Sequence, residues 1–266
     1  MKPVNIAAFA VAAVIAAPVL PAMAADLYEQ PVYKDFVPEQ PVAFGGWYLR
    51  GHIGMSNQRY KGLDYEYFDV AGYTQTWLDE GGFDAGGIYG AGIGYAFNDW
   101  LRVDATAEYR GKTGFRALDR FVNDPGTPDF FGINEYTATK SELLLLANVY
   151  ADLGSYAGFS PYIGAGIGTS RNTISHFNDA NVPRNGGGYA GKDSKWDLAW
   201  ALHAGVGYQV SDRVTLDLGY SYTHLGDATT APVQNYDPAF TRPNDGMKFR
   251  DISSHDLKLG FRYAFN

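Results

Sequence analysis

The amino-acid sequence predicts an all-β protein, an eight-stranded antiparallel up-and-down transmembrane β-barrel. Three observations predict this fold class. The chain of 266 residues holds 32 Gly, 20 Tyr and 16 Phe but no Cys, a composition that fits barrels and β-sandwiches. From residue 46 onward, apolar and polar residues alternate with a period of two, which is the period of a β-strand with two different faces. The connections between these segments alternate strictly between short and long.

Residues 1–24 have the features of a secretory signal peptide. Lys2 supplies a positive charge, residues 4–17 are apolar and uncharged, and the sequence AMA at 22–24 provides a cleavage site. The apolar stretch is shorter than the about 20 residues that a membrane-spanning helix needs. We therefore expect export, followed by a Pro-rich periplasmic linker at residues 25–45.

The barrel domain is predicted to occupy residues 46–266. Eight of its segments carry the strand alternation, and each is close to the about 10 residues that a tilted strand needs to cross a bilayer. These segments are 46–56, 86–97, 100–110, 139–153, 159–171, 196–210, 213–224 and 252–265.

The connections predict which end of the barrel faces the periplasm. Residues 98–99, 154–158 and 211–212 are short and contain the Asn, Asp, Ser and Gly typical of tight turns. Tight turns at one end and long loops at the other are typical of barrels that span an outer membrane. The predicted long extracellular loops are 57–85, 111–138, 172–195 and 225–251.

One hairpin pattern occurs twice in the chain. Residues 92–109, GIGYAFNDWLRVDATAEY, align without a gap with residues 205–222, GVGYQVSDRVTLDLGYSY. Each copy reads as strand, periplasmic turn and strand, with an aspartate in the middle of an apolar run. We expect both aspartates, Asp104 and Asp217, to point into the barrel.

The polar face of the predicted strands mixes charges with many Gly, Ala, Ser and Thr, whereas the other face is bulky and apolar. This mixture suits the narrow interior of an eight-stranded barrel, which side chains just fill. A charge facing lipid would cost about 2–4 kcal/mol at the bilayer midplane. We therefore expect an interior network of paired charges that narrows or closes the barrel. Its expected members are Arg50, Arg102, Asp104, Glu108, Arg110, Glu142, Asp152, Asp197, Asp217, Asp256, Lys258 and Arg262, together with His52 and His203.

Aromatic residues gather near the predicted turn end of the apolar face. Such residues form girdles at the level of the lipid headgroups in membrane barrels. The expected girdle consists of Trp47, Tyr95, Phe97, Trp100, Tyr208, Tyr263 and Phe265.

Composition and spacing argue against several classes of site. The formal net charge of −8 argues against a nucleic-acid partner, which favours a basic face. The absence of Cys rules out thiolate chemistry, and the five His residues have no metal-ligand spacing. The acids Asp64, Glu66 and Asp69 lack the spacing of a calcium loop. We expect no cofactor, no metal site and no catalytic residues.

Three stretches resemble the small outer-membrane β-barrels of alphaproteobacteria, the opacity-like and OmpA-like eight-stranded surface proteins. They are GWYLRGHIG at 46–54, ADLYEQP after the signal peptide, and the final strand HDLKLGFRYAFN. The resemblance implies a location in the bacterial outer membrane, with its bilayer and lipopolysaccharide as partners. It also implies insertion by the barrel assembly machinery, which reads the final strand. Here Phe265 is the penultimate residue, whereas the terminal residue of that signal is usually Phe.

The expected function is a structural or surface-interaction role in the outer membrane, with a possible host or surface ligand bound through the four long loops. Tyr65, Tyr67 and Phe68 are the candidate contact residues, because exposed aromatic residues anchor interfaces. One alternative is a porin-like channel for small solutes, since interior charges can line a pore as well as close it. A lipid A-modifying enzyme using Ser253 with His224 or His255 is less favoured, and a soluble lipocalin-like carrier is a further alternative.

Overall fold

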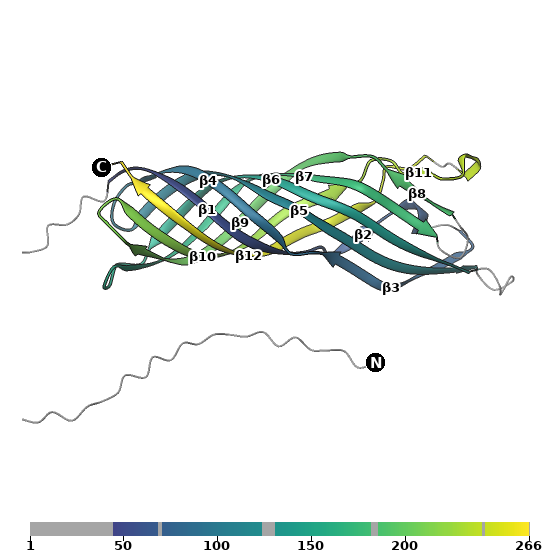
Figure 1. The fold of residues 1–266 in the computed structure, drawn as a ribbon, viewed down its shortest axis with the longest axis horizontal. Helices are drawn as coiled ribbons and strands as arrows, with labels where there is room; N and C mark the ends of the chain where they lie inside the picture. The colour runs from purple at the N-terminus through teal and green to yellow at the C-terminus, as the bar shows by residue number, and fades with distance from the viewer. Residues whose placement is uncertain (1–44, 69–70, 124–130, 182–185, 241–242, 266) are drawn as a thin grey trace, which may run out of the picture. The chain divides into compact units, whose positions relative to one another are not determined.

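The computed structural model describes residues 45–265 apart from 69–70, 124–130, 182–185 and 241–242. The predicted signal peptide and nearly all of the predicted linker lie outside the described residues. The described part is built almost entirely from β-strands (Figure 1). It contains no helix long and apolar enough to cross a membrane.

Eight long strands form a closed ring of antiparallel pairs. Their order around the ring is β1, β4, β5, β6, β7, β9, β10 and β12, and β12 pairs with β1 to close it. Neighbours in the ring are neighbours along the chain, which confirms the predicted up-and-down barrel. The ring strands are β1 (Gly46–Arg59), β4 (Gly86–Ala96), β5 (Leu101–Asn123), β6 (Phe131–Asp152), β7 (Phe159–Asn181), β9 (Asp193–Gln209), β10 (Val214–Thr229) and β12 (Lys248–Ala264).

Shorter elements join the ring at the end opposite the tight turns. Among the described residues, β3 pairs with β5, β8 with β7, β11 with β8, and β2 with β12. These elements are β2 (Gly62–Asp64), η1 (Glu66–Phe68), β3 (Tyr73–Phe83), β8 (Gly186–Ala190), β11 (Gln234–Asn235) and η3 (Pro238–Phe240).

The prediction of long loops at 111–138 and 172–195 was wrong, because most of these residues are strand. Strands β5, β6 and β7 contain 23, 22 and 23 residues, about twice the length needed to cross a bilayer. The paired strands continue past the predicted membrane zone as an extension of the barrel (Figure 1). We call this part the extension.

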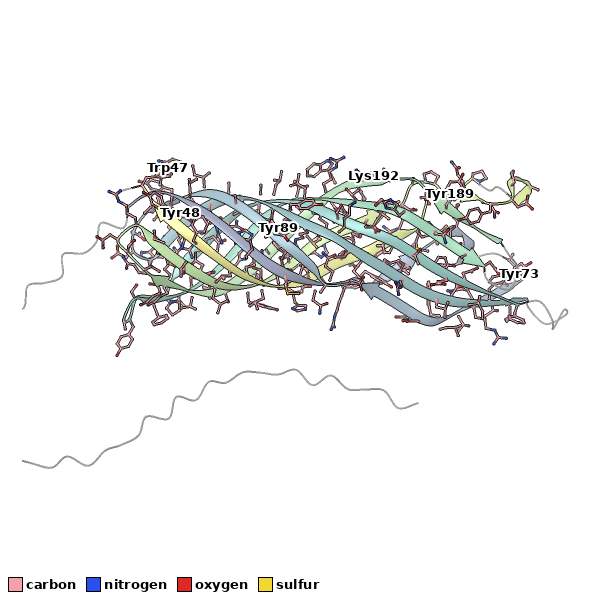
Figure 2. All side chains as sticks on the ribbon, in the orientation of Figure 1. Trp47, Tyr48, Tyr73, Tyr89, Tyr189 and Lys192 are labelled. Carbon is pink, nitrogen blue, oxygen red and sulfur yellow. The ribbon has the colours of Figure 1, made fainter. Side chains whose placement is uncertain are left out.

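Between the tight turns and the extension, the outer face of the barrel wall is apolar. On β1, Trp47, Leu49, Ile53 and Met55 are all exposed, with Ile53 and Met55 58% and 64% accessible. Figure 2 shows Trp47 and Tyr89 on the outer wall of this part. The band from Trp47 to Met55 fits the about 9–11 residues of a membrane-crossing strand.

A β-bulge on β5 exchanges the two faces of the strand where the extension begins. The register with β6 shifts between Arg110 and Thr113, so that β5 advances by one extra residue. On the turn side of the shift, the even-numbered Arg110 is buried. On the extension side, the odd-numbered Thr113 and Phe115 are buried and the even-numbered Arg116 is exposed. A slip of one residue turns every later side chain to the opposite face. Strands β10 and β12 shift in the same zone, between His224 and Ala228.

The extension therefore has the pattern of a water-soluble protein, with an apolar inside. Phe115 and Phe249 meet edge to face with ring centroids 4.9 Å apart, and Phe83 lies 5.4 Å from Phe249. Tyr65 and Phe68, which we expected to be exposed, are buried and partly buried against this cluster. Their aromatic rings stabilise the extension from within.

Candidate functional site

The barrel interior below the extension is filled by paired charges. The period-two alternation of the strands directs these side chains inward, and all of them are buried or mostly buried. In this part of the described interior, outside the extension, the inward groups comprise six cations and six anions, so their formal charges balance, the two histidines aside. They are Arg50, Arg102, Arg110, Lys140, Lys258 and Arg262, with Asp104, Glu108, Glu142, Asp152, Asp217 and Asp256.

The two aspartates of the repeated hairpin both lie inside, each 5% exposed. Arg262 binds Asp217 through two contacts, from Nε to Oδ2 at 2.8 Å and from Nη2 to Oδ1 at 3.0 Å. Arg50 Nη1 lies 2.7 Å from Asp104 Oδ2. Two-pronged arginine–carboxylate contacts fix orientation as well as supplying attraction.

Two inward tyrosine rings, Tyr150 and Tyr162, pack against the interior arginines. Arg102 binds Asp152 with Nε 2.9 Å from Oδ2. The Arg102 guanidinium also lies over the rings of Tyr150 and Tyr162, 4.2 and 4.8 Å from their centroids. Arg50 Nη1 donates to the Tyr150 hydroxyl at 2.8 Å. Side chains from β1, β5, β6 and β7 thus meet across the barrel.

Arg110 is the centre of a second cluster nearer the extension. Its Nη2 lies 2.8 Å from Glu108 Oε1 and 2.6 Å from Asp256 Oδ2. Lys258 reaches the other oxygen of Glu108 at 2.6 Å, and His52 Nε2 lies 2.8 Å from that same oxygen. Five charged or titratable groups on three strands therefore share one buried network.

Lys140 belongs to the interior network but was absent from the predicted set. It is fully buried, pairs with Glu142, and donates to Gln58 Oε1 at 3.0 Å. Gln58 in turn donates to Glu142 Oε2 at 3.0 Å. The sequence carried the signal needed to find it, since Lys140 shares the even-numbered phase of Glu142 on the same strand.

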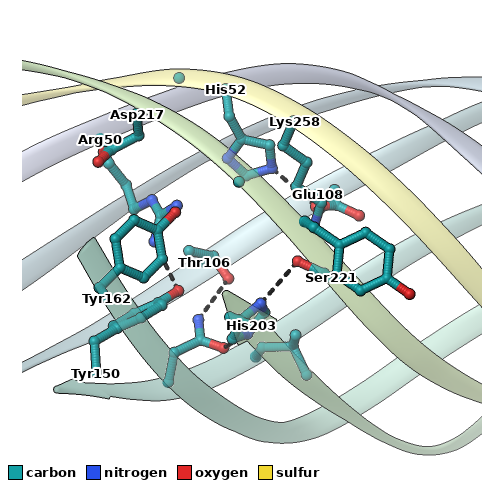
Figure 3. A pocket seen from close by; sticks show the side chains of 15 residues that line it. Arg50, His52, Thr106, Glu108, Tyr150, Tyr162, His203, Asp217, Ser221 and Lys258 are labelled. Carbon is teal, nitrogen blue, oxygen red and sulfur yellow. Dashed lines mark hydrogen bonds and ion pairs between the residues drawn. The ribbon is translucent and has the colours of Figure 1, made fainter. Parts of the chain in front are cut away.

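A small cavity lies beside His203 in the barrel interior (Figure 3). His203 contacts Ser221 through Nδ1 at 2.8 Å and Asn148 through Nε2 at 3.1 Å. The cavity volume is about 30 Å³, which accommodates roughly two water molecules. Arg50, Tyr162 and Lys258 project into it from the surrounding wall.

Asp197 lies apart from the interior network to which we assigned it. It is part of a half-buried group in the extension, where Lys195 Nζ lies 3.1 Å from its Oδ2 and the Asp227 amide donates to the same oxygen at 3.0 Å. Burial acts to raise the pKa of Asp197, but the Asp227 amide and Lys195 together hold this pKa below its usual range.

The residues of the alternative enzyme hypothesis lie on the outer face of the wall. His224 and Ser253 are partners in the β10–β12 register. The ring of His224 stacks on Trp200 at 5.7 Å, and His255 Nδ1 lies 2.6 Å from the Tyr220 hydroxyl. Both histidines therefore contact aromatic rings of the outer wall.

The predicted girdle residues lie near the tight turns, on the outside. Trp47 and Tyr95 are 5.4 Å apart between ring centroids, Tyr95 and Phe97 are 5.1 Å apart, and Tyr263 lies 6.0 Å from Phe265. Trp100 is 57% exposed. Tyr208 packs on Phe159 at 4.8 Å.

The opposite end carries a second group of exposed rings, which we call the tip. Tyr189 on β8 and Tyr236 after β11 lie 5.5 Å apart and are 46% and 54% exposed. Figure 2 shows Tyr73 and Tyr189 toward the end of the barrel far from Trp47. The β8–β11 pair carries Tyr189 on a strand, and Tyr236 directly follows β11, where its amide donates to the Gly187 carbonyl at 2.9 Å.

The chain matches the family described as "Outer membrane protein beta-barrel domain" over residues 9–265. It belongs to this family. An uncharacterized protein of Brucella abortus is 30% identical, covering 92% of this chain and 93% of its own length. Outer membrane protein PagN of Salmonella typhimurium is 26% identical over 67% of this chain and 74% of its own. A Rickettsia prowazekii protein named as a candidate adhesin is 29% identical, over 65% and 72%.

As a member of the outer membrane β-barrel family, the protein lies in the bacterial outer membrane, surrounded by lipid. The apolar outer band faces that lipid, as in barrels of this kind. The charged interior sits at the depth of the bilayer, where ions must be paired to be tolerated.

Proposed function

We propose that this outer-membrane barrel is a surface-interaction protein that binds a partner outside the cell through its tip. The observation that carries the proposal is the extension, whose paired strands and apolar core hold a rigid platform beyond the membrane. A binding site on rigid strands loses less conformational entropy on association than a site on mobile loops. The Rickettsia relative named as a candidate adhesin supports the same class of role.

The tip supplies the residue types that bind protein surfaces. Tyr189 and Tyr236 present two adjacent, exposed rings. Tyrosine is enriched at interface hot spots because it offers a large rigid contact area with a polar hydroxyl. Tyr65 and Phe68 face the core instead, so the candidate contact surface moves from the predicted loop 57–85 to the β8–β11 pair.

The packed interior favours this role over a solute channel. Charged side chains from strands that are not neighbours meet inside the barrel. Arg50 contacts Asp104, Arg110 contacts Asp256, and Lys258 contacts Glu108. The cavity beside His203 holds roughly two water molecules. A hydrated sugar or ion larger than water has no comparable space there.

An adhesion assay tests the proposal. A non-adherent Gram-negative strain displaying the full chain is added to epithelial monolayers, and bound cells are counted at equal surface abundance. We expect the change Tyr189→Ser with Tyr236→Ser to reduce binding about tenfold, the loss from two moderate hot-spot residues. The matched control is Tyr156→Ser, because Tyr156 is 86% exposed at a periplasmic turn. Equal adhesion by the double variant and the unaltered chain would contradict the proposal.

A further inference from the structure

Two acids in the extension are buried without a cation. Asp119 on β5 and Asp179 on β7 are 1% and 9% exposed, and neither forms an ion pair among the residues that the structure describes. The other acids buried in the described strands all pair with an arginine or a lysine; they are Asp104, Glu108, Glu142, Asp217 and Asp256. A buried charge is tolerated when it is paired or coordinates a metal ion. We call Asp119 and Asp179 the acid pair.

The strand register brings the acid pair together. Asp119 is the register partner of Asn134 on β6, and Asp179 is the register partner of Tyr136, two residues away on the same strand. Residues two apart on a strand share a face, and Asp119, Tyr136 and Asp179 are all buried. Burial, followed by the charge of Asp119, raises the pKa of the Asp179 carboxyl. The two carboxyl groups are therefore close enough to interact.

Each member of the acid pair keeps one buried oxygen without a hydrogen-bond donor. Gln75 Nε2 and the Tyr136 hydroxyl both donate to Asp119 Oδ2, each at 3.0 Å. The Oδ1 atoms of Asp119 and Asp179 are buried and have no donor within bonding distance in the described part of the chain. Leaving a buried acceptor unpaired is unfavourable. These two oxygens are therefore available as ligands for a cation.

The chemistry around the acid pair selects the class of cation. Tyr136 carries a hydroxyl, and Gln75 and Asn134 carry amides, so the oxygen of these groups is the ligand atom that they offer. Oxygen ligands favour hard cations such as Ca²⁺ and Mg²⁺ over zinc or copper. Gln75, Asp119 and Asp179 come from β3, β5 and β7. Such a dispersed set suits Ca²⁺, which accepts irregular coordination, better than Mg²⁺, which demands a near-ideal octahedron.

We propose that the acid pair binds a calcium ion inside the extension. Two carboxylates balance the charge of one Ca²⁺. The described residues contain no group of three or more acids or histidines suited to a metal ion, so water completes the coordination. With few charged ligands, we expect a weak site with a Kd of about 10⁻⁴–10⁻³ M, as in extracellular modules. The expectation of no metal site came from spacing along the chain, where Asp119 and Asp179 lie far apart.

Calcium at the acid pair has a consequence for the neighbouring strands. The ion joins β5 to β7, and β7 pairs with β8 through Asp179 and Gly188. Gly188 precedes Tyr189 on β8. Calcium therefore stiffens the strand that carries one tip tyrosine. The inference itself does not depend on a partner that binds at the tip.

Terbium luminescence tests the inference, because Tb³⁺ occupies calcium sites and emits when a nearby indole or phenol ring is excited. The ring of Trp77 lies 6.0 Å from that of Tyr136, so both ring types are present beside the acid pair. Tb³⁺ is titrated into the purified full chain in detergent and is then displaced by Ca²⁺. We expect Asp119→Asn with Asp179→Asn to weaken Tb³⁺ binding by about a hundredfold, since affinity depends on the number of charged ligands.

The matched control is Glu135→Gln. Glu135 precedes Tyr136 on β6 but is exposed, so its loss removes a nearby charge without touching the acid pair. Its affinity for Tb³⁺ should equal that of the unaltered chain. Heat-modifiable migration on a gel checks the folding of each variant. The single variants Asp119→Asn and Asp179→Asn serve if the double variant does not fold.

Amide exchange in β7 at pH 8 provides a second measurement. The unaltered chain is compared in Ca²⁺, in Mg²⁺ at the same concentration, and in EDTA. At about 10 mM Ca²⁺, roughly ten to a hundred times the expected Kd, binding to the folded state should slow exchange about ten- to hundredfold. The double variant should exchange at the same rate in Ca²⁺ and in EDTA.

Three results would overturn the inference. The first is equal Tb³⁺ affinity of the double variant and the unaltered chain, which removes the role of the acid pair. The second is an equal loss of affinity in Glu135→Gln, which makes the effect one of overall charge. The third is β7 exchange in Ca²⁺ that matches exchange in EDTA or in Mg²⁺, which removes the role of calcium.

Discussion

At the scale of single residues, each buried charge depends on a specific partner. Asp104 accepts contacts from Arg50, Asn148 and Tyr48, at 2.7, 2.8 and 3.2 Å. A buried ion pair adds little net stability compared with apolar packing, but breaking one leaves an uncompensated charge. The interior of this barrel is therefore sensitive to the loss of any single member.

We predict that Asp104→Ala destabilises the folded barrel by about 3–5 kcal/mol, because Arg50 is left buried without its carboxylate. Urea unfolding in detergent, followed by heat-modifiable migration, measures the change. Asp99→Ala is the control, since Asp99 is exposed in the tight turn, and it should shift the unfolding midpoint little. Similar midpoints for the two variants would show that Asp104 is not held as a buried charge.

A second residue-scale effect lies in the extension. Burial, and then the neighbouring Asp119 carboxyl, raise the pKa of Asp179 to about 7. The pKa of an Asp in an unfolded chain is about 3.9, so the folded state binds more protons between these values. Stability of the extension is therefore highest at acidic pH and falls as pH rises toward 7.

We predict that amide exchange in β7, corrected for its intrinsic pH dependence, is slower at pH 5 than at pH 8. Asp179→Asn should remove most of this difference, because an amide stays neutral at both values. If the β7 amides of the unaltered chain are equally protected from exchange at both pH values, protonation of Asp179 does not stabilise the extension.

At the scale of elements, the bulge on β5 explains which strands could be predicted. The alternation that places Arg102, Asp104 and Glu108 inward is continuous from residue 101 to 110, so those residues could be found from the sequence. Beyond the bulge the polar residues face water and the apolar ones face inward. Lys112 and Arg116 therefore broke the expected phase, and a strand of 23 residues was interpreted as a shorter strand and a loop.

The sequence does not determine which interior charges contact one another. Alternation assigns a side chain to a face but does not say which charges meet across the barrel. The contact of Arg110 with Asp256 depends on the register of strands far apart along the chain. Tyr150 and Tyr162, which contact Arg102, are not in the predicted set, since an inward Tyr on a polar face gives no distinctive sequence signal.

We predict that inserting one Ala between Lys112 and Thr113 turns Phe115 toward water, because β5 then carries a second extra residue against β6. The extension should become sensitive to added protease, because its apolar core can no longer form, while the membrane-spanning part still migrates as a folded barrel. Deleting Gly111 removes the bulge but leaves Thr113 and Phe115 facing inward, so this variant should resist protease and serves as the control. Equal protease resistance of the insertion and the deletion would show that the register of β5 does not set the two faces.

At the scale of the whole molecule, paired charges fill much of the described barrel interior. A small cavity of about 30 Å³ lies beside His203. Cross-strand contacts such as Arg262 with Asp217 join the walls near the turn end. We propose that this arrangement resists solute passage.

We predict that the purified chain gives no large, stable single-channel conductance in a planar bilayer. Replacing Arg110 and Glu108 together by Ala removes the central pairing and should produce measurable conductance or unstable channel events. Arg213→Ala, outside the interior, should behave like the unaltered chain. Large stable conductance of the unaltered chain would support the porin-like alternative.

The inversion at the bulge has a consequence for how such a chain can change over generations. Membrane thickness constrains the outer face of the lower strands, whereas water and the apolar core of Phe115 and Phe249 constrain the upper strands. Because the two demands fall on opposite faces of the same strands, a substitution acceptable to one zone need not disturb the other. The exposed end can therefore diversify under selection by its surroundings while the anchor in the bilayer stays the same.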